Sequence, residues 1–479
     1  MKLTPFFIQK YIKDTPTIFL YIMLLGATGC KKLVEVNTPT TNISAKNVYT
    51  TNQTAAAVLT SIYTQMSAMG VSGSDLTSIG FTTGLSSDEL TLYSGSGDTR
   101  LRNYFQNKLI PTNSDFWRTI YNEIYIANAA IEGINNSTTL SSPVRKQLLG
   151  EAKFIRSFCY FYLVNLYGDV PLVLGTDYTQ NRILSRTPQA KVWTQILADL
   201  TEAKLLLSPG YLDGYVSNPT TERVRPTQSA ATALLARCYL YTLDWKNAEL
   251  QATEVINNSG LYSLDSLSNV FLRNSSESIW QLQPVNFGSN TEDAKTYVLT
   301  GSGPNGANPV YLSLQLMSSF EIHDKRRKMW TGSITVAGIL YNFAYKYKVS
   351  ELNQPVTEYN TVLRLGEQFL IRAEARAQQD NLAGARSDLN AIRERAGLKA
   401  STLNDKTALL QSIYHERQVE LFTEWGHRWL DLKRTKTADI VMPAVTTQKG
   451  GTWSTNWQLY PIPPYDILYD GNLTQNTGY

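Results

Sequence analysis

An internal repeat constrains this chain more than any other feature of its sequence. Residues 236–260, beginning ARCYLYTLDW, align without a gap on residues 373–397, beginning AEARAQQDNL. In each copy, alanines stand where two helices would cross, a short polar turn follows, and a glycine closes the segment. The full units span 227–260 and 364–397. Because such a helix pair buries its apolar faces only against neighbouring pairs, the repeat predicts a stack of pairs.

Apolar periodicity extends this helical pattern along most of the chain. We expect helices at residues 44–69, 113–134, 143–167, 188–207, 227–242, 245–257, 362–379, 382–396 and 404–424. Ser142 before Pro143 and Thr187 before Pro188 are typical of helix starts. Each repeat unit has the length of a tetratricopeptide repeat. The sequence therefore predicts a mainly α fold, a tetratricopeptide-like solenoid of about four helix pairs, in which the first four helices form the divergent pairs.

Two stretches interrupt the helices. Residues 70–112 and 258–361 are rich in Gly, Ser, Thr, Asn and Tyr, with short alternating segments such as SIWQLQ and FAYKYKV. Loops this long are usually functional. We expect irregular, loop-rich insertions with short β-hairpins. The predicted parts are an N-terminal helical repeat region at 44–257, the insertion at 258–361, and a C-terminal helical repeat and closing segment at 362–479.

The N-terminus has the layout of an export signal. Three lysines precede an apolar run that ends near Thr28. This run is shorter than the ~20 apolar residues that a bilayer-spanning helix needs. We therefore expect residues 1–29 to be removed.

A cysteine follows the small residues at the end of this signal. Ala27-Thr28-Gly29-Cys30 is similar to a bacterial lipobox, although Leu25 lies two residues too early. We expect Cys30 to be acylated, with residues 30–43 as a flexible tether to the membrane. The alternative is a plain signal peptide with an incidental cysteine.

Charge and cysteine content exclude several classes of protein. The chain has 44 Lys and Arg against 40 Asp and Glu, and removal of the signal leaves a formal net charge near +2, so we expect no nucleic-acid partner. Cys159 and Cys238 lie in apolar helical patterns, where a cysteine behaves as a small hydrophobe. A disulfide between these two is the alternative.

Motif searches give no cofactor or metal site. Residues 301–306, GSGPNG, match a dinucleotide fingerprint in letters, but Pro309 follows where a phosphate-binding helix would begin. The histidines, His323, His415 and His427, lack the spacing of a zinc site. We therefore expect neither a cofactor nor a bound metal.

Two acidic pairs have the residue types that catalyse glycoside hydrolysis. They are Asp88-Glu89 and Glu292-Asp293, both in the insertions. Adjacent acids in loops are usually solvated, and nothing in the sequence indicates a pocket around either pair. We expect no enzyme, with a glycosidase as the weakest alternative.

The segment 413–435 mixes charge and aromatics most densely. Three glutamates share one stripe of the helix expected at 404–424: Glu416, Glu420 and Glu424. Three cations follow: Arg428, Lys433 and Arg434. We interpret these six residues as a structural ion-pair network, with a ligand site as the alternative.

Five segments together resemble the SusD/RagB family of outer-membrane lipoproteins. They are CKKLVEVNTPT, EAKFIRSFCYFYLVNLYGDVPLV, RPTQSAATALLARCYLY, ERQVELFTEWGHRWLDLKR and LYPIPPYDILYDGNLTQNTGY. They occur in the family's order and span Cys30 to Tyr479. The resemblance implies a tetratricopeptide scaffold on the outer face of the outer membrane of Bacteroidetes-type bacteria. It also implies an oligosaccharide or polysaccharide ligand that is not cleaved, and a SusC-like TonB-dependent transporter for which the protein acts as a lid.

The resemblance places the ligand on aromatic side chains of the insertions, because flat rings stack on the C–H faces of sugars. Candidate contacts are Tyr93, Arg100, Tyr104, Phe287 and Tyr297, with Asn103 and Asn286 as hydrogen-bonding partners. Packing of the insertion is the alternative for each. Four further aromatics are expected in the core: Trp117, Tyr121, Tyr125 and Trp280. The alternative function is a lipid-anchored scaffold that binds a protein partner, since tetratricopeptide grooves commonly do so.

Overall fold

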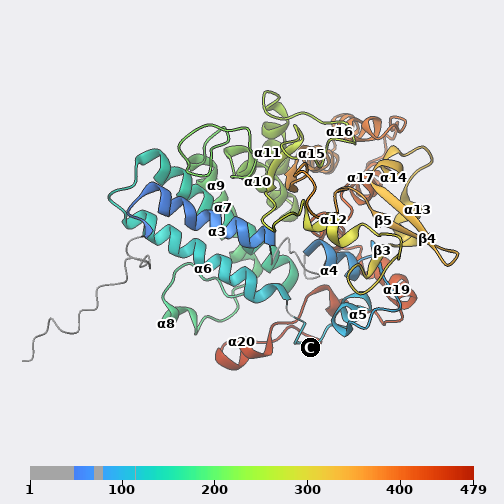
Figure 1. Ribbon diagram of the computed structural model, residues 1–479, viewed down its shortest axis with the longest axis horizontal. Helices are drawn as coiled ribbons and strands as arrows, with labels where there is room; N and C mark the ends of the chain where they lie inside the picture. The colour runs from blue at the N-terminus through green and yellow to red at the C-terminus, as the bar shows by residue number, and fades with distance from the viewer. Residues whose placement is uncertain (1–47, 69–78, 114) are drawn as a thin grey trace, which may run out of the picture. The chain divides into compact units, whose positions relative to one another are not determined.

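The long helices lie where periodicity predicts them. The computed structural model describes residues 48–68, 79–113 and 115–479 (Figure 1). Its long helices are α3 (Asn52–Ala68), α6 (Asp115–Asn136), α7 (Ser142–Tyr167), α9 (Gln189–Leu206), α10 (Gln228–Tyr241), α11 (Trp245–Asn257), α15 (Leu365–Gln378), α16 (Leu382–Arg395) and α17 (Lys406–Glu420). α6 packs on α7, α7 on α9, α9 on α10, α10 on α11, α11 on α15, and α15 on both α16 and α17. The mainly α fold is confirmed, and this packing order is the one that a solenoid requires.

The two repeat copies share the geometry of their turns. Leu243 and Asp380 stand at equivalent positions and are both left-handed, with φ of 61° and 63°. The next residues, Asp244 and Asn381, cap α11 and α16 by accepting the N–H three residues on. Their own N–H groups close the preceding helices with equal 2.9 Å bonds, to the carbonyls of Tyr239 and Arg376. The repeat read from the sequence is therefore a structural repeat as well.

Small side chains let the two copies pack closely. Ala236, Ala248 and Ala252 from the first copy form one buried cluster with Ile371 and Ala375 from the second. Each of these side chains is removed from solvent. Since every buried methylene contributes ~0.8 kcal/mol, alanine contacts add little each, and they act mainly by bringing the helix backbones together.

The insertions contain short elements. They comprise α4 (Ile79–Ser86), β1 (Leu90–Leu92), α5 (Thr99–Phe105), β2 (Ser278–Leu282), α12 (Glu292–Tyr297), β3 (Val310–Leu312), α13 (Leu314–Ser319), α14 (Lys325–Met329), β4 (Thr331–Val336), β5 (Ile339–Ala344) and β6 (Asn360–Arg364). The first five residues of SIWQLQ form β2, whereas only the first two residues of FAYKYKV belong to β5.

Three antiparallel strand pairs form among the described residues. Only β4 and β5 make a hairpin. The β1–β3 pair joins the first insertion to the second through Leu90 opposite Leu312. The β2–β6 pair holds residues 360–364 in a strand, so α15 begins at Leu365 and not at 362 as predicted. Long-range pairing, which periodicity cannot show, thus fixes both insertions to the helices.

The C-terminal segment adds four short elements after α17. They are α18 (His427–Arg434), α19 (Ala438–Gln448), η2 (Thr455–Gln458) and α20 (Pro464–Tyr469). Figure 1 shows α20 and the C-terminus near α5. Within the described part of the chain, no helix is both long enough and apolar enough to span a bilayer. The signal, Cys30 and the tether expected at 30–43 lie outside the described residues.

Aromatic side chains pack the core around Trp280. This ring is fully buried, as predicted, and lies 5.1 Å from the ring of Phe154 and 5.5 Å from that of Phe158. Trp117 is also buried, and Tyr121 is half-buried with its hydroxyl donating to the Pro171 carbonyl. Tyr125 is 53% exposed, so its expected core role is wrong. Helical spacing places it near the buried stripe of α6 but does not say where that stripe ends.

A buried ion-pair cluster, here called the α17 junction, joins α17 to the second insertion. It consists of Glu277, Arg326, Lys346, Arg364, Arg395, Glu416, Glu420 and Glu424. Glu420 receives Arg364 Nη1 at 2.7 Å on Oε1 and Arg326 Nη1 at 2.8 Å on Oε2. Burial opposes its ionisation, but Arg395, Arg364 and Arg326 outweigh this and lower the pKa of Glu420.

The predicted ion-pair network is thus present, but the cations that pair with its glutamates differ from the three that the sequence predicted. α17 ends at Glu420, so Glu424 lies in the following turn, which still brings it to Arg364 and Lys346. The three cations expected on the glutamates pair elsewhere: Arg428 with Asp88, Arg434 with Glu374 and Asp431, and Lys433 with the Asn165 carbonyl. Cys159 and Cys238 are separate buried thiols, so the alternative disulfide is absent.

Candidate functional site

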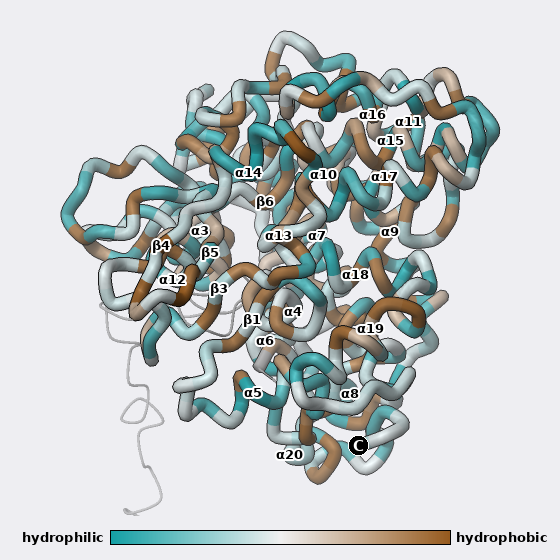
Figure 2. The backbone as a smooth tube through the Cα atoms, turned by 90° about the vertical axis from the view of Figure 1, so that its right-hand side faces the viewer, coloured by the Kyte–Doolittle hydropathy of each residue, from teal (hydrophilic) through white to brown (hydrophobic). Residues whose placement is uncertain are grey.

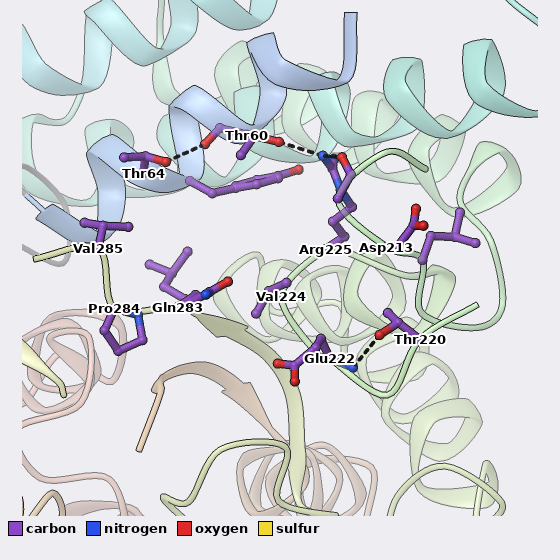
Figure 3. A pocket seen from close by; sticks show the side chains of 14 residues that line it. Thr60, Thr64, Asp213, Thr220, Glu222, Val224, Arg225, Gln283, Pro284 and Val285 are labelled. Atoms are coloured by element: carbon purple, nitrogen blue, oxygen red, sulfur yellow. Dashed lines mark hydrogen bonds between the residues drawn. The ribbon is translucent and has the colours of Figure 1, made fainter. Parts of the chain in front are cut away.

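A cavity of about 410 Å³ opens between three segments that are distant in sequence. Its walls are the C-terminal half of α3, the loop 207–227 between α9 and α10, and the end of β2 with residues 283–285. Figure 3 shows side chains from all three segments around the opening. A concave, largely apolar space with a few polar groups is the usual form of a small-molecule site.

α3 presents one face to the cavity. Thr60, Tyr63 and Thr64 line it, since residues three and four apart share a helix face. The Tyr63 hydroxyl donates to Glu151 Oε2 at 2.6 Å. Burial, together with the nearby Glu151 carboxylate, raises the pKa of Tyr63 well above its usual value, so the phenol is neutral. The ring is therefore a fixed, uncharged aromatic wall.

Arg225 ties the walls together. Its Nη1 donates to Glu151 Oε2 at 2.6 Å, and its Nη2 donates to Thr60 Oγ1 at 2.7 Å and to the Gly214 carbonyl at 2.8 Å. The guanidinium carbon also lies 5.8 Å from the Tyr63 ring centroid. Because these contacts reach both α3 and the 207–227 loop, Arg225 positions the site and has little capacity left for a ligand.

Asp213 shapes the tip of the 207–227 loop. Leu212 and Pro219 form an isolated antiparallel bridge, and Asp213 Oδ1 accepts the N–H groups of Tyr215 and Ser217 at 3.2 and 2.9 Å. The bond from Ser217 is the main reason that the pKa of Asp213 is lowered. This closed turn holds the Tyr215 ring outward, 64% exposed.

Tyr215 borders a second, open groove. This groove of about 680 Å³ runs along α3 and is lined by Gln53, Ser61 and Gln65 besides Tyr215. Thr60, Thr64 and Gly214 line both spaces, so the groove continues from the cavity.

The loop 283–291 forms the remaining edge. Pro284 and Val285 line the cavity, and Phe287 stands 98% exposed two residues further on. Asn286 Nδ2 donates to Glu292 Oε1 at 2.6 Å, which fixes the base of the loop on α12. The Phe287 ring is therefore open to solvent near the cavity edge formed by Pro284 and Val285.

The predicted contacts fall into two separate groups. Asn286 and Phe287 lie on this loop beside the cavity. Tyr93, Arg100 and Asn103 lie around β1 and α5, and α5 is apart from α12 in both views (Figures 1 and 2). Asn103 Nδ2 is engaged with Asn113 Oδ1 at 3.0 Å. The structure does not bring the two groups into one site.

Two predicted contacts require correction. Tyr104 is fully buried beside Tyr460, with the ring centroids 5.5 Å apart. Tyr297 is buried against Phe81 at 6.2 Å. A ring enclosed by side chains has no face for a sugar, so both tyrosines pack the insertions.

Sequence reasoning missed Tyr63 and Tyr215. Tyr63 follows helical spacing and resembles a core residue. Tyr215 lies in GYLDGYVSNPT, which has the same Gly, Tyr, Asn and Pro content as the insertions. That composition, in the long connection 207–227 between two helices, is the signal that could have located the loop.

The acidic pairs are not solvated as expected: Asp88, Glu89 and Glu292 are buried, and Asp293 is partly buried. Arg428 Nε and Nη2 each donate to the Asp88 carboxylate at 2.7 Å. Burial opposes ionisation of Asp88, but Arg428 outweighs it and lowers the pKa of Asp88. Burial and Asp88 raise the pKa of Glu89 to about 8, and burial with Glu424 and Glu292 raises that of Asp293 to about 7. Across residues 48–68, 79–113 and 115–479, no three His, Cys, Asp or Glu side chains converge as metal ligands.

Two family models match the chain. A model described as "Starch-binding associating with outer membrane" matches residues 41–240. A model of the SusD family matches residues 325–479. The second model includes the whole repeat unit 364–397, whereas the first model ends at residue 240, within the unit 227–260.

Individual relatives agree with these matches. SusD-like protein P2 of Formosa agariphila is 27% identical over 522 aligned positions, covering 96% of this chain and 99% of that protein. A solved SusD superfamily protein from Bacteroides vulgatus superposes with a TM-score of 0.77 at 22% identity, over 90% of this chain and 100% of that one. A solved laminarin-binding SusD-like protein gives a TM-score of 0.71 at 23% identity, over 89% and 99%. The structural likenesses show the fold.

Proposed function

The chain belongs to the SusD family, and from this premise we propose that it captures a nutrient glycan outside the cell and delivers it to a SusC-like TonB-dependent transporter. The family associates with the outer membrane. In this proposal the protein sits lipid-anchored on the outer surface of that membrane and acts as the lid of the transporter. Acylated Cys30 holds it there, and residues 30–43 let the lid swing.

The observation that carries the proposal is the cavity and its rim. Tyr63 offers a neutral ring inside the cavity, and Tyr215 offers an exposed ring on the adjoining groove. Phe287 offers a second exposed ring on the loop that follows the cavity-lining Val285. Stacking on such rings suits the apolar face of a pyranose. Between the rings stand short polar side chains, among them Thr64, Gln65 and Gln283, which can pair with sugar hydroxyls.

Comparison with relatives supports a glycan as the ligand class. One matching family model is described as starch-binding, and one solved relative as laminarin-binding. Starch and laminarin differ in linkage, so the class common to both is a glucan chain and not one specific polymer. Binding without cleavage agrees with the commitment of Asp88 to Arg428.

Isothermal titration calorimetry against a panel of glycans tests the proposal. We expect binding of at least one polymer, and binding weaker by about fivefold or more after Tyr215→Ala or Phe287→Ala, because stacking on one aromatic ring contributes ~1 kcal/mol or more. Tyr178→Ala is the matched control, since this ring is 74% exposed on the short helix α8 (Tyr178–Asn181) and lines neither space. Unchanged affinity in both rim variants would remove this site, and absence of binding to every polymer would remove the function.

The membrane anchor has its own test. Mass spectrometry of the mature N-terminal peptide is expected to show an acylated Cys30, and Cys30→Ala is expected to leave the membrane fraction. A mature peptide that begins elsewhere without acyl mass would contradict the anchor while leaving glycan binding intact.

A further inference from the structure

Among the described residues, the walls of the site provide no free positive charge. α3 (Asn52–Ala68) contains no Lys, Arg, Asp or Glu, and neither does the segment 283–291. The 207–227 loop carries two acids, Asp213 and Glu222, and two arginines, Arg223 and Arg225. Any cation that these walls present to a ligand must therefore come from the two arginines.

Both arginines are turned into the protein. Arg225 is bound by Glu151, Thr60 and the Gly214 carbonyl, as described above. Arg223 donates to the Ser278 carbonyl at 2.7 Å and to the Leu261 carbonyl at 2.9 Å. Its guanidinium also lies between the rings of Tyr211 and Tyr262, at 5.2 and 5.3 Å from their centroids.

Of the two acids in the 207–227 loop, Glu222 has a cationic partner among the described residues and Asp213 has none. Glu222 pairs with Arg273 across 3.3 Å at a partly exposed position. The Asp213 carboxylate accepts only neutral N–H groups, from Tyr215, Ser217 and Asn218. Glu151 balances Arg225 and Arg273 balances Glu222, so two charges of the described walls remain without a charged partner: Arg223, held by carbonyls and rings, and Asp213 at the loop tip. The walls are therefore neutral overall, and the unpaired charge at the loop tip is negative.

Resting on the proposed glycan binding, we propose that this surface selects uncharged glycan chains and discriminates against polymers that carry carboxylate or sulfate groups. Sugar hydroxyls both donate and accept, so they can pair with the threonines and glutamines of α3. A carboxylate or sulfate would leave its hydration shell without meeting an available cation, and it would approach Asp213. One such like-charge contact weakens binding by about fivefold in bulk water, and by more at the lower effective dielectric of a protein surface.

The continuity of cavity and groove implies a chain and not a single sugar. The shared residues Thr60, Thr64 and Gly214 form the passage between the two spaces. A chain that runs over α3 meets neutral polar side chains along its length, so each anionic unit in a polymer adds to the discrimination.

Matched polymer pairs test this selection. Suitable probes are laminarin with sulfated laminarin, starch with carboxymethyl starch, and methyl-esterified with de-esterified homogalacturonan, because each pair differs chiefly in charge. We expect at least one neutral probe to bind and its charged partner to bind tenfold more weakly or worse at low salt. Added salt is expected to narrow this difference by screening.

A lysine introduced on the α3 wall provides a second test of the selection against charged polymers. Thr64 is an exposed helix residue whose hydroxyl donates to the carbonyl four residues earlier, at 3.0 Å. Thr64→Lys is expected to raise the affinity for the charged partner severalfold. The matched control is Thr194→Lys on α9, where an exposed threonine makes the same 3.0 Å bond and lines neither space.

The outcomes separate the selection from the function. Preference for the neutral member, reduced by Thr64→Lys and unchanged by Thr194→Lys, supports the selection. Equal or tighter binding of the charged member overturns it and leaves glycan binding standing. Absence of binding to every probe of either kind overturns both.

Discussion

The α17 junction and the α3 wall of the cavity use charge in opposite ways. The junction buries arginines and glutamates together, among them Arg326, Arg364 and Glu420, each almost wholly removed from solvent. The α3 wall has no charged residue. Burying charges is costly unless each is paired and hydrogen-bonded, so the junction depends on every partner. The comparison indicates that charge in this protein holds the second insertion on the helices, whereas the α3 wall of the proposed ligand site is neutral.

Removing one carboxylate from the junction is expected to have the largest effect. Glu420→Gln leaves parts of Arg326, Arg364 and Arg395 buried without a counter-charge, and we expect the free energy of unfolding to fall by ~3–5 kcal/mol. Chemical denaturation measures this change.

The control is the same chemical change in a surface pair. Asp380 lies 3.0 Å from Lys406, and both side chains are exposed. Asp380→Asn is expected to cost less than ~1 kcal/mol. Equal losses of unfolding free energy in Glu420→Gln and Asp380→Asn would contradict the conclusion that the α17 junction depends on its buried ion pairs.

Glu89 is a buried acid that lies outside the α17 junction. The pKa of Glu89 is raised from 4.5 to about 8, by burial first and then by Asp88. Between these values the folded protein keeps a proton that the unfolded chain has lost. The free energy of unfolding should therefore fall as pH rises through this window, with a contribution from Glu89 of ~1 kcal/mol per pH unit.

Glu89→Gln cannot ionise, so its unfolding free energy is expected to depend less steeply on pH between about 5 and 8. Denaturation at a series of pH values measures the slope. Glu351→Gln, at an exposed position, should keep the slope of the unaltered protein. Identical slopes in all three proteins would refute this account of Glu89.

The rings of Tyr63 and Tyr215 are expected to have different roles: Tyr63 supports the fold, and Tyr215 contacts the ligand. Tyr63→Phe removes the donor to buried Glu151, and we expect a loss of ~1–2 kcal/mol in unfolding free energy. Tyr215→Ala removes a ring that is mostly in water, so we expect a change within ~0.5 kcal/mol despite the loss of glycan affinity. Thermal and chemical unfolding compare the two variants. A large destabilisation by Tyr215→Ala would indicate that its ring supports the fold.

Periodicity predicted the long helices because apolar spacing is a local feature. The helix starts expected from Ser142 and Thr187 are each shifted by one residue: the N-caps are Ser141 for α7 and Pro188 for α9, and neither makes a side-chain cap hydrogen bond. The repeat was readable since its turn residues, Leu243 with Asp244 and Asp380 with Asn381, repeat the same local geometry. The end of α17 was not predicted. The residues after it include Thr423, Trp425 and Gly426, all with positive φ, and nothing in their apolar pattern indicates that the helix stops.

The site was harder to predict because its parts are distant in sequence. The cavity needs Tyr63, Val224 and Pro284 together, and the pairing of Asp88 with Arg428 joins opposite ends of the chain. Composition located the loop of Phe287 correctly as an exposed aromatic segment. It could not distinguish Phe287 from Tyr297 ten residues later, because burial depends on the side of α12 that faces the body.

Hydrogen–deuterium exchange with and without a bound oligosaccharide tests whether this cavity binds the glycan. We expect slower exchange on binding in the 207–227 loop and the 283–291 loop, with smaller changes in α3. We expect no change in the segment 451–463, which is also largely loop. Protection confined to the region of β1 and α5, around Tyr93, with exchange in the 207–227 loop unaltered, would contradict the assignment of this cavity as the glycan site.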